Sequence, residues 1–271
     1  MHDYAKSQRL EGKVALVTGG GGGIGAESAR ALAQMGAAVL VTDVAEAAGK
    51  ATVDGIVKAG GRAAFFKHDV TNEAQWEAAV AEAIKQFGGY DILLNNAGIE
   101  TAAFITQCTN EDFSRVMNVN VNGVFLGIKH TIRAMAPGGA AGKGGSIINL
   151  SSVAGLIGTT GHIAYHTSKG AVRLMSKAAA VECAQLGTGV RVNSVHPAIV
   201  RTEMGDNFMK HFVDLGLAPD VATAEAAVGA GHLLGFGKPS DVAGAVVYLA
   251  SDASRWMTGT EFTIDGGYTA I

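Results

Sequence analysis

Short apolar runs alternate with longer segments of helical periodicity along almost the whole chain. The first run, Lys13–Thr18, is rich in β-branched residues and ends in glycine, whereas the next segment, Ile24–Met35, carries Ala, Leu and Met at helical spacing. Continuously apolar strands are typical of parallel sheets that are buried on both faces. The alternation therefore predicts an α/β fold, a doubly wound parallel sheet with helices on both faces.

The alternation continues to the C-terminus and predicts about seven strands. We expect strands at 13–18, 38–42, 63–67, 91–94, 146–150, 190–195 and 261–264, and helices at 24–35, 46–59, 73–87, 111–135, 164–186 and 241–250. No linker or low-complexity tract divides the chain, so residues 1–271 are expected to form a single domain. The segment 201–238 breaks the rhythm with many Met, Phe and Leu residues, and such excursions are often lids. A subunit contact is the alternative.

A glycine-rich turn, Gly19–Gly23, joins the first predicted strand to the first helix. This arrangement points backbone amides and the positive end of a helix dipole at a pyrophosphate, as in Rossmann-type dinucleotide sites. The residues alone leave the register open. It can be Gly20, Gly22 and Gly25; Gly21, Gly23 and Ala26; or Thr18-Gly19-x-x-x-Gly23-Ile24-Gly25.

Asp43 closes the second predicted strand, roughly 20 residues after the glycines, where a carboxylate can accept both ribose hydroxyls of an adenosine. The same carboxylate would repel a 2′-phosphate. No Arg or Lys stands within the glycine turn or next to Asp43 to neutralise it. The expected cofactor is therefore NAD rather than NADP.

Tyr165 and Lys169 lie four residues apart in the predicted helix 164–186, so their side chains point the same way, one turn apart. A tyrosine hydroxyl has a pKa near 10, too high for efficient proton exchange at neutral pH. A nearby ammonium group favours the phenolate and lowers that pKa. The pair is thus a candidate acid/base.

Four motifs in this order and at these distances resemble the short-chain dehydrogenase/reductase family, in its soluble single-domain branch. The motifs are Thr18-Gly-x-x-x-Gly23-Ile24-Gly25, Asn95-Asn96-Ala97-Gly98, Ser152, and Tyr165-x-x-x-Lys169. The resemblance covers nearly the whole chain. It selects the third glycine register and implies that Gly19, Gly23, Ile24 and Gly25 bind the cofactor.

The resemblance also implies the catalytic roles. Tyr165 would exchange the proton, and Lys169 would lower its pKa and bond the nicotinamide ribose. Ser152 would hold the substrate oxygen, because the family's serine lies thirteen positions before the tyrosine. Asn120 would anchor a water molecule in the proton relay, because the family's asparagine lies three positions before a glycine, here Gly123.

Further cofactor contacts follow from the same resemblance. They are Asp69 and Val70 at the adenine, Asn96, Ala97 and Gly98 on the adenosine side, and Val200 and Thr202 at the nicotinamide carboxamide. One position departs from the family pattern, since Ala198 follows Pro197 where the family usually has glycine. Asp265-Gly266-Gly267 resembles the family's C-terminal signature, although a simple turn explains it equally well.

The expected reaction is NAD-dependent hydride transfer between a secondary alcohol and its ketone. The apolar loop Val153–Gly158 and the apolar residues of 201–238 favour a bulky or cyclic substrate, such as a hydroxysteroid, alicyclic or aryl alcohol. The alternatives are a 3-oxoacyl thioester reductase and, in a different class, a non-catalytic NAD-binding sensor. The resemblance implies a homotetramer paired through helices 111–135 and 164–186. Charged residues are only 17%, which also suggests covered surface.

Other partners find little support in the sequence. The net charge of −3 and the lack of a basic block argue against nucleic acid and anionic membranes. No run reaches the roughly 18 apolar residues of a membrane helix and the N-terminus is polar, so a cytoplasmic protein is expected. His162 and His166 lie four apart, but no third ligand is evident, and no metal site is expected.

Overall fold

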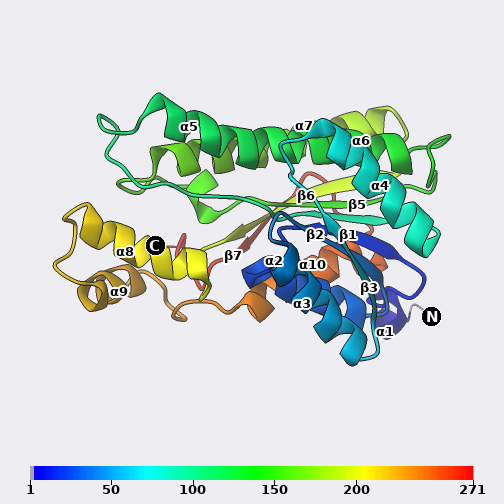
Figure 1. Ribbon diagram of the computed structural model, residues 1–271, viewed down its shortest axis with the longest axis horizontal. Helices are drawn as coiled ribbons and strands as arrows, with labels where there is room; N and C mark the ends of the chain where they lie inside the picture. Colours follow the sequence, from blue (N-terminus) through cyan, green and yellow to red (C-terminus); the bar gives the residue numbers. More distant parts are fainter. Residues whose placement is uncertain (1–2, 271) are drawn as a thin grey trace.

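A computed structural model describes residues 3–270, so residues 1–2 and 271 of the expected domain lie outside the described part (Figure 1). All seven strands pair in parallel in the order β3-β2-β1-β4-β5-β6-β7. This confirms the predicted fold class. The strands are β1 (Val14–Thr18), β2 (Ala38–Asp43), β3 (Arg62–Lys67), β4 (Ile92–Asn95), β5 (Gly145–Leu150), β6 (Val190–Pro197) and β7 (Glu261–Ile264).

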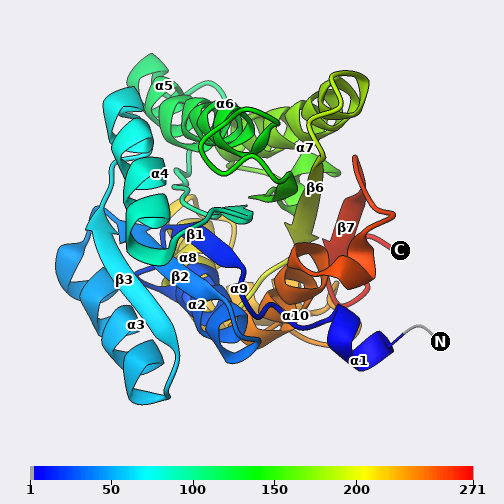
Figure 2. The ribbon, with the colours of Figure 1, turned by 90° about the vertical axis from the view of Figure 1, so that its right-hand side faces the viewer.

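Helices cover both faces of the sheet (Figures 1 and 2). One apolar core packs α4 (Glu73–Phe87), α6 (Gly123–Met135) and α7 (Ile163–Gln185) on the sheet. The other packs α2 (Gly23–Gln34), α3 (Glu46–Lys58) and α10 (Pro239–Ala250) on the opposite face. Strand residues alternate between the two cores, because successive side chains of a strand point to opposite faces. Leu16 belongs to the first core and Val17 to the second.

The segment predicted as one helix at 111–135 is helical from Asn110 to Met135, but it is not α-helical throughout. The segment is α5 (Asn110–Met117), a π-helical turn (Asn118–Asn122) and α6. At the centre of the turn, the buried Asn120 side chain binds the backbone of Ile99: Oδ1 accepts from its N–H at 2.8 Å and Nδ2 donates to its C=O at 2.8 Å. A π turn inserts an extra residue into a helix and is frequent at functional sites. Here it places a carboxamide against the chain that follows β4.

The segment 201–238, predicted to break the strand–helix alternation, is partly helical. It contains two helices, α8 (Glu203–Asp214) and α9 (Val221–Gly229), which pack together at one end of the molecule (Figure 1). The short α1 (Tyr4–Ser7) was likewise not predicted. Within 3–270, every helix is too short or too polar to cross a bilayer.

The strand order reverses between β1 and β4, where the chain leaves the two strands toward opposite sides of the sheet. In an open α/β sheet, such a point creates a crevice beyond the carboxyl ends of the strands. The glycine turn follows β1 and the Asn96-Ala97-Gly98 segment follows β4 at this crevice. The fold therefore brings the predicted motifs together there.

Candidate active site

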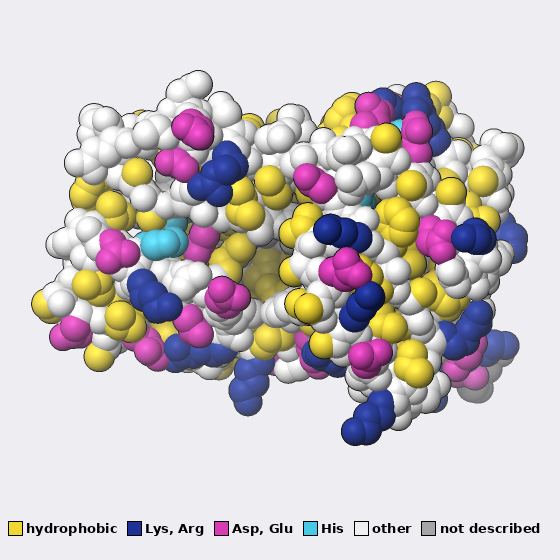
Figure 3. Space-filling view, in the orientation of Figure 1, with side chains coloured by type: hydrophobic (Ala, Val, Ile, Leu, Met, Phe, Trp, Pro, Cys, Tyr) yellow, Lys and Arg dark blue, Asp and Glu magenta, His cyan; other side chains and the backbone are white. Residues whose placement is uncertain are grey.

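A cavity of about 500 Å³ opens beyond the carboxyl ends of the strands. The face in Figure 3 is hollowed near its centre, with apolar side chains at the bottom of the hollow. Most of the predicted site residues line the cavity. They are Gly19, Gly23, Ile24, Asp43, Asp69, Val70, Asn96, Ala97, Gly98, Ser152, Tyr165, Lys169, Val200 and Thr202. Gly25 and Asn120 do not line the cavity.

The glycine turn has the backbone that the third register requires. Gly19 and Gly23 have φ angles of +61° and +51°, in the left-handed region that favours glycine. A Cβ on Gly25 would lie 2.2 Å from the Gly19 carbonyl oxygen. Helix α2 begins at Gly23 with no side-chain cap, so its first amides are free to bind phosphate oxygens. The turn therefore fits a pyrophosphate.

The end of β4 braces this turn. The Asn96 side chain donates from Nδ2 to the carbonyl oxygens of Thr18 at 2.9 Å and Gly19 at 3.0 Å. The Thr18 hydroxyl in turn accepts from the backbone N–H groups of Asn96 and Ala97. Asn96 thus holds the glycine turn open beside the cavity, while Gly98 continues along its wall.

Asp43 is fixed at the end of β2 by two backbone amides. Its Oδ2 accepts from Gly21 N–H at 2.9 Å and its Oδ1 from Ala45 N–H at 2.8 Å. Further along the cavity, the Asp69 carboxylate accepts from the backbone N–H and the hydroxyl of Thr71. Both carboxylates are therefore held by the chain before any ligand arrives.

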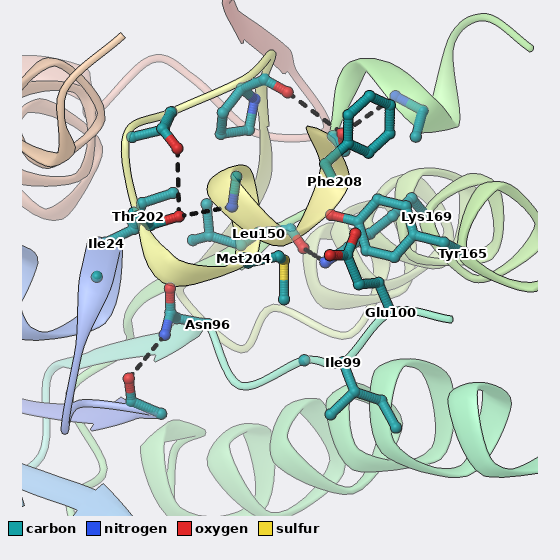
Figure 4. A pocket seen from close by; sticks show the side chains of 18 of the residues that line it. Ile24, Asn96, Ile99, Glu100, Leu150, Tyr165, Lys169, Thr202, Met204 and Phe208 are labelled. Atoms are coloured by element: carbon teal, nitrogen blue, oxygen red, sulfur yellow. Dashed lines mark hydrogen bonds between the residues drawn. The ribbon is translucent and has the colours of Figure 1, made fainter. Parts of the chain in front are cut away.

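Tyr165 and Lys169 lie one turn apart at the start of α7, as predicted (Figure 4). The Lys169 Nζ lies 5.4 Å from the centre of the Tyr165 ring and donates to the Leu150 carbonyl oxygen at 2.7 Å. Burial lowers the pKa of Lys169 to about 8, because an ammonium group is disfavoured away from water.

The expected lowering of the Tyr165 pKa is not found. Burial raises the pKa of Tyr165, the negative charge of Glu100 raises it further, and the Ser152 hydroxyl only partly opposes them. The Lys169 ammonium is directed at the Leu150 carbonyl and the ring face, so it leaves the tyrosine pKa high. Tyr165 is consequently a protonated hydroxyl at neutral pH in this structure.

Ser152 and Asn120 complete the set of predicted catalytic residues. The Ser152 hydroxyl donates to the Pro197 carbonyl at 3.2 Å and accepts from Ala154 N–H at 3.1 Å. The Asn120 Nδ2 also donates to the Ser168 hydroxyl at 3.0 Å, so both amide hydrogens are used within the protein. Its side chain positions the backbone next to Lys169 and is not open to the cavity.

The chain after β6 forms the remaining wall. Thr202 caps α8, because its hydroxyl accepts from Gly205 N–H at 3.2 Å, and Val200 is buried beside it. No non-glycine residue in 3–270 has a positive φ angle, so Ala198 fits its position without backbone strain. The departure from the family's Pro-Gly therefore leaves this wall intact.

The sequence did not predict a polar cluster that borders the cavity. Glu100, His162 and His211 each bring one atom within 4.8 Å of the others. The sequence suggested His162 and His166 as a pair, but the His166 ring instead contacts Ala154, Ile157 and Thr159. The partners of His162 are about 60 residues before it and about 50 after it, which no local pattern reveals.

Comparison with known proteins gives relatives along almost the whole chain. A family model described as enoyl-(acyl carrier protein) reductase matches residues 19–269. An NADP-dependent (R)-specific alcohol dehydrogenase of Lentilactobacillus kefiri is 40% identical over 270 residues, covering 97% of this chain and 99% of the relative. A cyclopentanol dehydrogenase of Comamonas sp. (strain NCIMB 9872) is 40% identical over 262 residues, covering 97% and 99%.

A solved structure agrees with these relatives. The crystal structure of a short-chain type dehydrogenase/reductase from Mycobacterium marinum superposes with a TM-score of 0.90 at 36% identity, covering 99% of this chain and 100% of that one. The chain therefore belongs to the short-chain dehydrogenase/reductase family.

Proposed function

We propose that this protein is an NAD-dependent oxidoreductase that interconverts a bulky or cyclic secondary alcohol and its ketone. One observation carries the proposal: Tyr165, Lys169 and Ser152 line the same cavity as a glycine turn that fits a dinucleotide. The relatives named as alcohol dehydrogenases support the reaction type.

Tyr165 is proposed as the acid/base. Its raised pKa keeps the hydroxyl protonated at neutral pH, ready to donate to a ketone oxygen as negative charge develops there. Ser152, whose hydroxyl borders the same space, would hold that oxygen. A nicotinamide bound beside Tyr165 would supply or accept the hydride. In alcohol oxidation Tyr165 would first release its own proton to water, and the phenolate would then accept the proton of the substrate hydroxyl.

Lys169 and Asn120 are proposed to support this proton exchange. The Lys169 ammonium faces the Tyr165 ring and would also contact the nicotinamide ribose. Both amide hydrogens of Asn120 are donated within the protein, to Ile99 and Ser168, so its side chain has no hydrogen left to donate to a relay water. The contacts inferred from the family for Val200 and Thr202 stay part of the proposal.

The preference for NAD rests on Asp43. Two amides hold its carboxylate at the end of β2, where it would accept the ribose hydroxyls and repel a 2′-phosphate. The position where a cationic side chain would neutralise it is Gly22, which has open space around it and no charge. The Lentilactobacillus relative is named as NADP-dependent, so cofactor choice is a separate test of this chain.

The substrate class rests on the apolar wall of the cavity. Its members come from the loop after Ser152 and from α8 and its surroundings: Val153, Ile157, Ile199, Met204, Phe208 and Val228. Apolar lining with a few convergent polar groups is typical of sites for small organic ligands. Because the segment 201–238 supplies half of this wall, we propose that it acts as a lid.

An oxidation screen tests the proposal. Purified protein with NAD⁺ or NADP⁺ is offered steroid, alicyclic and aryl secondary alcohols, and formation of the reduced cofactor is followed by absorbance. We expect turnover of at least one of these classes, with NAD⁺ favoured. Reduction of 3-oxoacyl thioesters with NADPH and no alcohol oxidation would favour the reductase alternative. Tight NADH binding without any turnover would favour a sensor.

A further inference from the structure

Three buried polar atoms in one cluster lack any hydrogen-bond partner. They are Glu100 Oε1, His162 Nε2 and His211 Nδ1. His162 is only 1% exposed and comes just before α7, Glu100 follows β4, and His211 belongs to α8. A buried polar atom without a partner costs free energy, so native proteins rarely keep several together. The cluster therefore has the character of a site that a ligand completes.

The hydrogen bond of Nδ1 determines which nitrogen of the His162 ring carries the hydrogen. Nδ1 lies 3.1 Å from the Thr160 carbonyl oxygen, which can only accept, so Nδ1 carries the hydrogen. Burial lowers the pKa of His162 to about 4, and the ring is neutral at pH 7. Nε2 is consequently a bare acceptor, and its missing partner must be a donor.

Glu100 can supply the complementary hydrogen. Its side chain is 10% exposed, and burial raises its pKa to about 7, so at mildly acidic pH it is a neutral carboxyl group with a hydrogen to donate. A hydroxyl group suits this pair, because it can donate to Nε2 and accept from the carboxyl. A carbonyl group can only accept and would leave Nε2 without a partner.

Glu100 and His162 both line the cavity that contains Tyr165 and Ser152. Figure 4 shows the carboxyl of Glu100 directed into the same part of the cavity as Tyr165, with Met204 and Phe208 facing them. The His162 ring stacks on Phe208 with ring centres 4.5 Å apart. The polar pair is thus a small hydrophilic patch in an otherwise apolar wall, beside the acid/base.

We propose that Glu100 and His162, with His211 next to Glu100, form a subsite that binds a second hydroxyl group of the substrate, away from the carbon that is oxidised. The proposal rests on the proposed function and specifies its substrate class as a diol or hydroxyketone. The reacting hydroxyl remains at Tyr165 and Ser152.

The test compares cyclohexanol with cyclohexane-1,3-diol and cyclohexane-1,4-diol, using NAD⁺ at pH 6. At least one diol should have a kcat/KM about tenfold or more above cyclohexanol, because cyclohexanol leaves the buried pair unsatisfied. The His162→Phe variant keeps a ring to stack on Phe208 but removes the acceptor. In this variant the ratio of kcat/KM for the preferred diol to kcat/KM for cyclohexanol should fall to about one.

Two substitutions of Glu100 separate hydrogen bonding from packing. Glu100→Leu should abolish the diol preference, whereas Glu100→Gln should retain it, because a carboxamide still donates and accepts. His130→Asn serves as the matched control, since His130 binds Glu73 at 3.0 Å and lies outside the cavity. It should leave the ratio unchanged. Thermal melting and NADH binding establish that each variant is folded.

Equal kcat/KM values for cyclohexanol and both diols in the wild type would overturn the subsite while leaving the proposed function in place. If none of the three alcohols is oxidised, the subsite is tested by the binding of each alcohol to the complex of the protein with NADH. A larger rise in melting temperature with a diol than with cyclohexanol, lost in His162→Phe, would support the subsite even though the proposed function had failed. The absence of such a difference in melting temperature would overturn the subsite.

Discussion

At the scale of single residues, the folded state disfavours the ionised form of Glu100. Its pKa of about 7 lies above the ordinary carboxyl value of 4.5 because it is buried without a hydrogen-bond partner. The folded state therefore binds this proton more tightly than the unfolded state. Stability contributed by the neutral form is present below pH 4.5 and is lost as pH rises through 7.

The Glu100→Gln variant tests this sign. At pH 8 the variant should be more stable than the wild type by about 2–3 kcal/mol, because it removes the cost of ionising a buried carboxyl. At pH 4 the two should be nearly equal. Urea unfolding at both pH values measures the difference. An equal effect at the two pH values would show that packing, rather than ionisation, is responsible.

Cofactor choice is also decided by single residues. Replacing Asp43 by Ser and Gly22 by Arg removes the carboxylate and adds a cation where a Cβ meets nothing within 4 Å. The ratio of kcat/KM for NADPH over NADH should rise roughly tenfold to hundredfold, since a charge-assisted contact replaces a repulsion. Steady-state kinetics with both cofactors measure this ratio. An unchanged ratio would refute the role of Asp43.

At the scale of elements, the start of α2 depends on a glycine that no other residue can replace. A Cβ on Gly25 would lie 2.2 Å from the Gly19 carbonyl oxygen, so Gly25→Ala must displace the turn. Overpacking of this kind costs about 1–3 kcal/mol. We expect a lower melting temperature and at least a tenfold weaker NADH affinity, measured by fluorescence titration.

Gly22→Ala is the matched control for this substitution. Gly22 is extended, with a φ of −159°, and a Cβ there has open space. Its melting temperature and NADH affinity should stay close to those of the wild type. If Gly22→Ala were as damaging as Gly25→Ala, the turn would be sensitive to any added side chain and the proposed register would lose its support.

The central strands were predictable because β1, β4 and β5 are short, mostly apolar runs buried between two helical layers, so their composition reflects their environment. The π-helical turn at Asn118–Asn122 was not predictable, because the apolar spacing runs through it and the contact of Asn120 is with Ile99, about 20 residues earlier. For the same reason, the motifs located Tyr165 and Asp43, whereas the polar pair of Glu100 and His162 is visible only after folding.

At the scale of the whole molecule, α6 and α7 leave large apolar side chains in water. Phe125 is 50% exposed, Leu174 68% and Val181 58%. Leu174 and Val181 are seven residues apart and share one face of α7. Exposed apolar faces are typical of protein–protein interfaces. We propose that they form part of the interface of the homotetramer that the family resemblance implies.

The double substitution Leu174→Glu and Val181→Glu tests this interface. Two carboxylates on a buried contact should shift the protein to dimers or monomers, because a desolvated charge without a partner is strongly unfavourable. Size-exclusion chromatography with light scattering measures the mass. Val57→Glu, at an exposed apolar position on α3, should leave the mass unchanged. A wild type that is already monomeric would contradict the proposed assembly.

The central claim is that this fold carries out hydride transfer with Tyr165 as its acid/base. The most direct test is Tyr165→Phe, measured with the best secondary alcohol of the screen and with NADH titration on the same sample. The account predicts a fall in kcat of about 10²–10⁴ with NADH affinity nearly unchanged, because only the proton-exchanging hydroxyl is lost. A variant that binds NADH and keeps a near-normal kcat would contradict it.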